Sequence, residues 1–108
     1  KEKQHDFFHM VDDVPYMNQV VQVKEEYKEK LPAVTHVDGS ARVQTVYKNT
    51  PIHDLLTEFE KLSGFPILLN TSFNVKDKTM VLTPKDAIDT FYDTEMDILV
   101  LGNYVIYK

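Results

Sequence analysis

A polar segment in the first half of the chain carries residue types that bind anions or metal ions. Residues 36–42 read His-Val-Asp-Gly-Ser-Ala-Arg, and Arg42 is the only arginine among the twelve basic residues. A guanidinium is a planar fork of donors that can hold a phosphate or a carboxylate through two hydrogen bonds. Asp38 is the only other charged residue between positions 31 and 47. The segment therefore predicts either an anion site at Arg42 or a buried Arg42–Asp38 ion pair.

His36 and Asp38 form a second possible site within this segment. Residues two apart on a strand point the same way, so this pair could contribute two metal ligands. Two ligands do not complete a site, and the alternative is an aspartate that caps a turn beside a packed histidine. Gly39 permits a positive φ angle, and Ser40 adds a hydroxyl group. The chain has no cysteine, which excludes disulfides, cysteine-ligated zinc and thiol nucleophiles.

A second polar cluster, Asn-Thr-Ser-Phe-Asn, occupies residues 70–74 and follows the apolar run at 66–69. In open α/β sheets, ligands bind where strands end at their carboxyl side. Amide and hydroxyl donors at such an edge can hold a phosphate oxygen without adding charge. Asn70 and Ser72 are thus candidate ligand contacts, with an ordinary turn as the alternative.

The elements that must position these residues can be predicted from periodicity and turn signals. Val-rich and β-branched patterns predict strands, and Thr-Pro pairs followed by apolar residues at helical spacing predict helices. We expect strands within 17–24, on both sides of a turn within 33–47, at 66–69 and at 79–82, helices at 51–63 and 84–93, and a hairpin over 97–107. This order indicates an α/β (α+β) domain with a twisted mixed sheet and crossover helices. Residues 1–15 are expected to be a leading segment or the remnant of a linker.

Length and charge narrow the class of protein. The 108 residues suffice for one domain or part of one. A net charge of −5 argues against a nucleic-acid-binding protein, which needs a basic face. No apolar run approaches the roughly 20 residues that span a bilayer, and no apolar stretch follows the first residues. We therefore expect a cytoplasmic chain with no nucleic-acid partner and no membrane contact.

Four blocks, taken together and in order, resemble one family. They are Pro-Ala-Val-Thr-His-Val-Asp-Gly-Ser-Ala-Arg-Val-Gln-Thr-Val at 32–46, Pro-Ile-Leu-Leu-Asn-Thr-Ser-Phe-Asn at 66–74, Thr-Pro-Lys-Asp-Ala at 83–87 and Leu-Val-Leu-Gly-Asn at 99–103. The family is the C-terminal domain of the O-carbamoyltransferases that act on nodulation factors, cephamycins and aminoglycosides. The resemblance implies a YrdC-like fold for residues 16–108. These residues would form only part of a complete YrdC-like domain.

The resemblance also implies a function. The chain would be part of an ATP-dependent O-carbamoyltransferase that binds carbamoyl phosphate and ATP, with magnesium accompanying the nucleotide, and forms a carbamoyl-adenylate. An N-terminal Kae1-like domain of the same polypeptide would then transfer the carbamoyl group to an acceptor hydroxyl. By motif matching, Arg42 would hold phosphate oxygens, and Asn70 and Ser72 would line the same pocket. Ser40, Asp38 and His36 belong to the Arg42 block, and the chain itself would hold no metal.

Two departures from the family pattern shape the expectation. Ser40 stands where the family usually has threonine, which keeps the hydroxyl. The family also draws lysine and arginine residues from an upstream region, so we expect the isolated chain to be inactive. The alternatives are a non-catalytic binding module, either a YrdC-like RNA-binding domain or a domain that docks on a catalytic neighbour. The net charge of −5 weighs against RNA binding.

Overall fold

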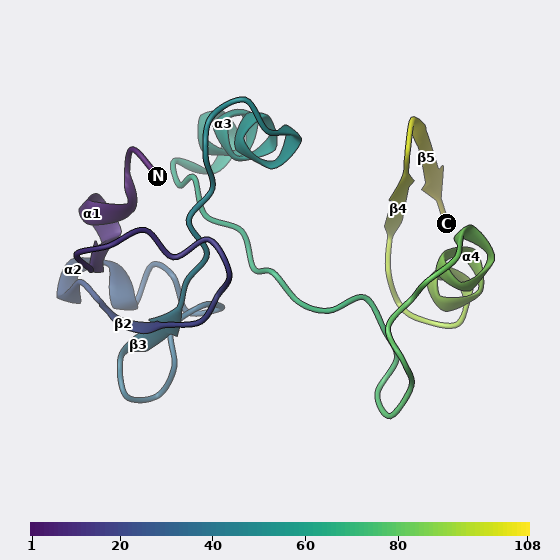
Figure 1. The fold of residues 1–108 in the computed structure, drawn as a ribbon, viewed down its shortest axis with the longest axis horizontal. Coiled ribbons are helices and arrows are strands. Elements are labelled where there is room, and N and C mark those ends of the chain that lie inside the picture. Colours follow the sequence, from purple (N-terminus) through teal and green to yellow (C-terminus); the bar gives the residue numbers. More distant parts are fainter. The chain divides into compact units, whose positions relative to one another are not determined.

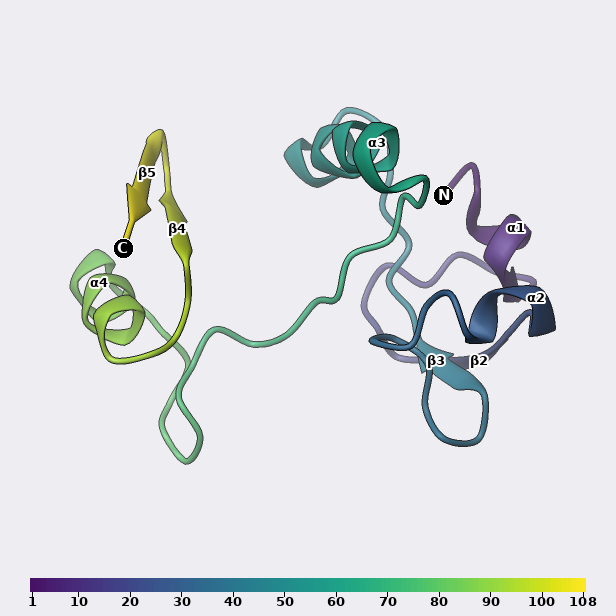
Figure 2. The ribbon, with the colours of Figure 1, turned by 180° about the vertical axis from the view of Figure 1, so that it is seen from behind.

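The computed structural model describes all of residues 1–108, which form two compact units, Lys1–Leu69 and Asn70–Lys108. Short helices and two small sheets make up both units, as the α+β class predicts (Figures 1 and 2). The first unit contains α1 (Gln4–Phe7), β1 (Phe8–His9), β2 (Val20–Val23), α2 (Glu25–Lys28), β3 (Ser40–Arg42) and α3 (Pro51–Ser63). The second contains α4 (Pro84–Tyr92), β4 (Ile98–Leu101) and β5 (Tyr104–Tyr107).

The sheet of the first unit has the order β1-β2-β3, and both pairings are antiparallel. Side chains alternate across β2, so Val21 and Val23 face the core while Val20 and Gln22 are exposed. The buried cluster behind the sheet consists of Phe7, Phe8, Val23, Leu31 and Ala41. The opposite face carries Val20, Gln22 and Arg42, which are exposed, and Ser40, which is buried.

The segment 1–15, which we expected to be a leading segment or a linker remnant, contributes to this core. Phe7, Phe8 and Val14 are all buried. Phe8 pairs with Val23 across the first two strands, and the Phe7 ring lies edge-on to Tyr27 at 4.8 Å between centroids. The aromatic pair at positions 7 and 8 was the sequence signal of this role, because two adjacent aromatic side chains are seldom both left in water.

The second unit is built around α4 and the β4–β5 hairpin. The hairpin turns at Gly102 and Asn103, as predicted. Ala87 and Phe91 of α4 are buried together with Leu99 of β4, and they form the second core cluster. Phe91 has no exposed surface at all. One aromatic side chain thus anchors the hairpin to the helix.

Both long helices begin where the Thr-Pro pairs predicted. Thr50 and Thr83 are the N-caps of α3 and α4, and a proline follows each cap. Thr83 and Asp86 form a full capping box, as the spacing indicated. Gly64 ends α3 in the left-handed conformation with φ of 81°. These local predictions are confirmed.

Three predicted strands are absent: those at 66–69, at 79–82 and in the first half of 33–47. The predicted mixed sheet is also absent, because both observed sheets are antiparallel. Residues 66–69 form no strand, and Leu69 is exposed. Pro66 lacks the N–H group that a ladder requires. Residues 79–82 form a single backbone hydrogen bond to another segment, from Val81 N–H to the Phe73 carbonyl at 2.9 Å. Short apolar runs carry no information about a partner strand, and here none pairs with them.

The predicted strand–turn–strand over 33–47 shortens to β3 alone. Local bonds occupy the first half: the Thr35 hydroxyl donates to the Leu31 carbonyl at 2.7 Å, and Gly39 N–H donates to the His36 carbonyl at 2.9 Å. Threonine often bonds to nearby backbone in this way and so competes with sheet formation. No helix of the structure is both long enough and apolar enough to cross a membrane.

Candidate functional site

Ser40 links His36 and Asp38 in a hydrogen-bonded turn. The Ser40 hydroxyl donates to Asp38 Oδ1 at 2.6 Å, and the Ser40 backbone N–H donates to the same oxygen at 3.0 Å. His36 Nδ1 lies 3.0 Å from Ser40 Oγ. Since the serine proton is directed at Asp38, the histidine nitrogen is the donor in that contact. Gly39 makes the turn possible with φ of 80°.

This network defines the chemistry available at the turn. Hydrogen bonds from the Ser40 side chain and backbone lower the pKa of Asp38 below its ordinary value, so the carboxylate stays ionised at neutral pH. The serine hydroxyl donates to a carboxylate rather than to a histidine, which is not the arrangement of a Ser-His-Asp nucleophile. No group of three or more metal-ligating side chains occurs. Asp38 therefore acts as the predicted turn cap, although His36 beside it is exposed rather than packed.

Arg42 is exposed at the end of β3, and the alternative of a buried Arg42–Asp38 ion pair is wrong. Asp38 is engaged by Ser40 instead. Cross-strand pairing sets Arg42 opposite Val20, which is also exposed. Because Ala41 is buried in the core, the alternation of β3 directs Arg42 to the solvent face. A lone guanidinium presented in this way can meet an anion.

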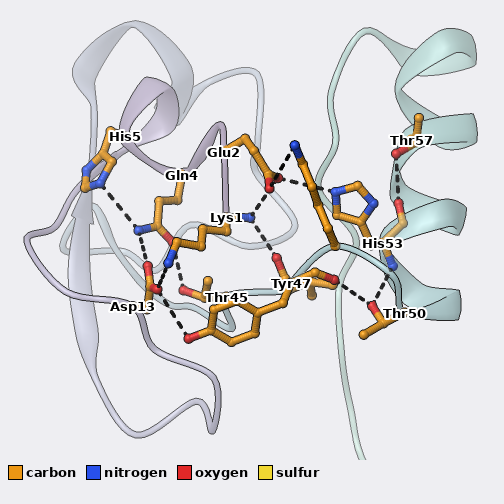
Figure 3. Close-up of polar contacts among 12 residues, drawn as sticks. Lys1, Glu2, Gln4, His5, Asp13, Thr45, Tyr47, Thr50, His53 and Thr57 are labelled. Atoms are coloured by element: carbon orange, nitrogen blue, oxygen red, sulfur yellow. Dashed lines mark hydrogen bonds and ion pairs between the residues drawn. The ribbon is translucent and has the colours of Figure 1, made fainter.

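The residues after Arg42 are held by contacts that the sequence did not reveal (Figure 3). The buried Thr45 hydroxyl accepts from Val14 N–H at 2.8 Å and donates to Gln4 Oε1 at 2.9 Å. Thr45 N–H donates to the Val14 carbonyl at 2.7 Å, and Gln4 Nε2 donates to Asp13 Oδ1 at 2.9 Å. The segment 4–14 therefore fixes the chain three residues beyond Arg42, and no local pattern signals such a pairing.

The carboxylate of Asp13 joins Gln4 to two further side chains, those of Lys1 and Tyr47. Lys1 Nζ lies 2.5 Å from Asp13 Oδ2, and the Tyr47 hydroxyl donates to the same oxygen at 3.3 Å. Hydrogen bonds from Lys1 and then Gln4 lower the pKa of Asp13. Burial, followed by the charge of Asp13, raises the pKa of Tyr47. Tyr47 consequently remains a neutral donor.

In the second unit, the predicted cluster at 70–74 is a loop, and Asn74 organises it. The Asn74 side chain accepts from the Ser72 hydroxyl at 2.6 Å and donates to the carbonyls of Val75 and Lys78, each at 3.2 Å. Sequence reasoning named Asn70 and Ser72, both of which are exposed, and gave Asn74 no role of its own. Arg42 belongs to the first unit and these residues to the second, so a shared pocket stays a prediction.

A shallow hollow of about 260 Å³ opens within the second unit. Its lining is mostly apolar and carries no charged side chain: Phe73, Val81, Leu82, Thr83, Pro84, Ala87, Leu99, Val100 and Leu101. Neither Asn70 nor Ser72 is among the lining residues. This hollow therefore lacks the donors that a phosphate group requires.

Comparison with known proteins assigns the family. Residues 1–108 match the profile described as carbamoyltransferase C-terminus. The chain belongs to the carbamoyltransferase C-terminus family. It is 44% identical over 113 residues to nodulation protein NolNO of Sinorhizobium fredii, covering 100% of this chain and 17% of that protein. Nodulation protein NolO of Bradyrhizobium diazoefficiens is 43% identical, covering 100% of this chain and 21% of that protein.

A third member, nodulation protein U of Rhizobium tropici, is 49% identical over 63 residues, which is 56% of this chain and 11% of that protein. The chain thus spans about a fifth of the length of the curated relatives that it matches end to end. The resemblance seen in the four sequence blocks is confirmed. The match to the family profile covers residues 1–108 and so includes residues 1–15.

Proposed function

We propose that this chain contributes to the carbamoyl-phosphate and ATP site of an O-carbamoyltransferase, where a carbamoyl-adenylate forms before transfer to an acceptor hydroxyl. Membership of the carbamoyltransferase C-terminus family over all 108 residues supports this assignment. In this proposal an N-terminal Kae1-like domain is the partner that carries out the transfer. Nucleic acid and membrane have no part in it.

The proposed reaction runs in balanced steps. Water cleaves carbamoyl phosphate into carbamate and phosphate, and a carbamate oxygen then attacks the α-phosphorus of ATP, from which pyrophosphate leaves. The acceptor hydroxyl finally displaces AMP from the carbamoyl carbon and loses its proton. Negative charge shifts between phosphate oxygens in each of the first two steps, so fixed donors and cations at those oxygens accelerate them. No protein nucleophile is required.

The exposed guanidinium of Arg42 is the observation that carries the proposal. Asp38, the one carboxylate in its block, is bound by the hydroxyl and N–H of Ser40. Arg42 is exposed and forms no ion pair with that carboxylate. In the proposed site Arg42 holds phosphate oxygens, and the His36–Asp38–Ser40 turn keeps β3 in place. Asn70 and Ser72, in the loop of the second unit, are proposed as further ligand contacts, and magnesium would accompany the ATP phosphates.

Substitution of Arg42 in the full-length protein tests the proposal. A charge-assisted hydrogen bond contributes about 1.5–3 kcal/mol, so Arg42→Ala should weaken phosphate-ligand binding roughly ten- to a hundredfold. Pyrophosphate release in the presence of ATP and carbamoyl phosphate is the readout, and Arg42→Lys should restore it only in part. The isolated 108-residue chain should release no pyrophosphate. If Arg42→Ala instead unfolds the domain and a folded Arg42→Met variant keeps full activity, Arg42 is structural and the site assignment fails.

A docking role is the second candidate, and one feature of α3 favours it. No residue of α3 is buried, and its apolar side chains Ile52, Leu55 and Leu62 are more than half exposed. An apolar stripe of this kind is typical of a helix that packs against another surface. Docking and ligand binding involve different residues of the chain, so the two roles are compatible. Polar substitutions on α3 that release a neighbouring domain without changing ligand affinity would separate them.

A further inference from the structure

Lys28, the last residue of α2, lies against the Asp38–Gly39–Ser40 turn. A Cβ atom placed on Gly39 would lie 2.8 Å from both Cε and Nζ of Lys28 and 3.5 Å from Oε1 of Gln22. Gly39 also adopts φ of 80°, which disfavours any other residue. The absence of a side chain at Gly39 therefore admits the ammonium group to the backbone of the turn.

The register of the sheet relates this ammonium group to Arg42. Gln22 pairs with Ser40, and Val20 pairs with Arg42. Paired residues of antiparallel strands share a face, and diagonal neighbours on that face lie about 7–8 Å apart. Gln22 and Arg42 are such diagonal neighbours, and both are exposed. Because Lys28 and Gln22 approach the same point at Gly39, the ammonium group lies at the end of the face that carries Arg42.

The charges around Lys28 permit it to bind a ligand. Its Nζ is paired with Glu25 Oε2 at 2.6 Å, and the Glu25 side chain is 85% exposed. The Lys28 side chain is 31% exposed, and water screens the ion pair from the Glu25 side, so the pair is readily exchanged. The other nearby carboxylate, Asp38, already accepts two hydrogen bonds from Ser40. A phosphate group, with more charge and more acceptor oxygens than Glu25, can therefore displace the Glu25 carboxylate.

We propose that Lys28 and Arg42 bind the same phosphate group, with the Gln22 amide as a neutral donor between them. The inference rests on the proposed function and deepens it, because it supplies the second cation that the Arg42 block lacks in the sequence. The shared chemistry is a phosphate group, which either carbamoyl phosphate or ATP can provide. Lys28 is then a specificity residue for phosphate ligands.

Calorimetric titration of the full-length protein tests this assignment, with carbamoyl phosphate and the magnesium complex of a non-hydrolysable ATP analogue as separate probes. Lys28→Met keeps the length of the side chain and removes its charge, so it should weaken binding of at least one probe roughly tenfold. Lys28→Arg should stay near the wild-type affinity. Lys61→Met is the matched control, since Lys61 forms an equivalent i,i+3 pair with Glu58 at 2.6 Å. That control should change neither affinity by more than about twofold.

A double-mutant cycle tests whether the two cations share one phosphate. If they do, the Lys28→Met/Arg42→Ala protein should lose less affinity than the product of the single losses, because contacts to one group are coupled. Independent losses, or a Lys28→Met protein that binds both probes as tightly as the Lys61→Met control, would overturn the inference while leaving Arg42 in place. A wild-type protein that binds neither probe would overturn the proposed function, and the assignment of Lys28 with it.

Discussion

The helices α3 and α4 start from the same local signal and reach different environments. Each begins with a threonine cap and a proline, and each has apolar residues at helical spacing. Yet α4, with nine residues, buries Ala87 and Phe91, whereas α3, with thirteen, buries none. The longer helix, which also begins with a threonine cap and a proline, contributes no residue to a buried core cluster.

The difference separates two contributions to helix stability. Caps and proline act within one turn and set where a helix begins. Burial depends on a second surface, which the β4–β5 hairpin supplies to α4 through Leu99. In α3 the corresponding side chains stay in contact with water. We therefore expect substitutions in α4 to change the stability of the whole second unit, and substitutions in α3 to change only the stability of that helix.

The largest effect is expected from Phe91→Ala. Removing a fully buried aromatic side chain costs about 3–5 kcal/mol, from lost burial and from the cavity left behind. Amide hydrogen exchange of β4 and β5 should accelerate accordingly, since Phe91 joins the hairpin to α4. Phe59→Ala in α3 is the matched control, because Phe59 belongs to neither core cluster, and it should cost about 1 kcal/mol or less. Equal losses would contradict the contrast between the helices.

A smaller effect is expected from removal of the caps. Thr83→Ala breaks the capping box and should lower the unfolding free energy of the second unit by about 1 kcal/mol. Thr50→Ala removes the bond from His53 N–H, at 3.3 Å, and should fray only the first turn of α3. Exchange rates of the two hairpin strands report the first change, and those of the first α3 amides report the second. A Thr50→Ala protein with a destabilised first core would show that α3 is coupled to that core.

Acidification should weaken α4 through the same capping box. Hydrogen bonds from the side chain and the backbone N–H of Thr83 lower the pKa of Asp86 in the folded state. A lowered folded pKa stabilises the fold above the unfolded value, about pH 3.9, and this contribution disappears as the pH falls through the folded pKa. Helix content measured by circular dichroism between pH 6 and 2 should fall less steeply in Asp86→Asn than in the wild type. Identical profiles would mean that Asp86 is uncoupled from folding.

The smallest effect is expected on the apolar face of α3. Leu62 is 88% exposed, so Leu62→Gln should change the unfolding free energy of the 108-residue chain by no more than about 0.5 kcal/mol. Leu99→Gln, at a buried position of β4, is the contrasting variant and should be strongly destabilising. Urea denaturation measures both. A large loss for Leu62→Gln would show that this face is covered in solution.

Local rules explain which parts of the fold could be predicted. The bounds of α3, the start of α4 and the hairpin turn at Gly102 depend on interactions within a few residues, and all agree with the structure. The Asp38 turn cap belongs to the same class, because its hydrogen bonds reach only two residues along the chain. The strands expected at 66–69 and 79–82 failed because a strand needs a partner from elsewhere, and β-propensity does not name one.

By itself, the sequence determined the capped helices, the glycine turns and the four blocks that identify the family, since each is carried by residue types at short spacing. Only the tertiary structure decided that Arg42 faces solvent rather than Asp38, and that Lys28 reaches the backbone of Gly39. It also decided that Thr45 is fixed by Val14 and Gln4, more than thirty residues away along the chain. Such contacts join groups that are far apart in the sequence and that meet only when the chain folds. The spacing of nearby residues therefore does not predict them.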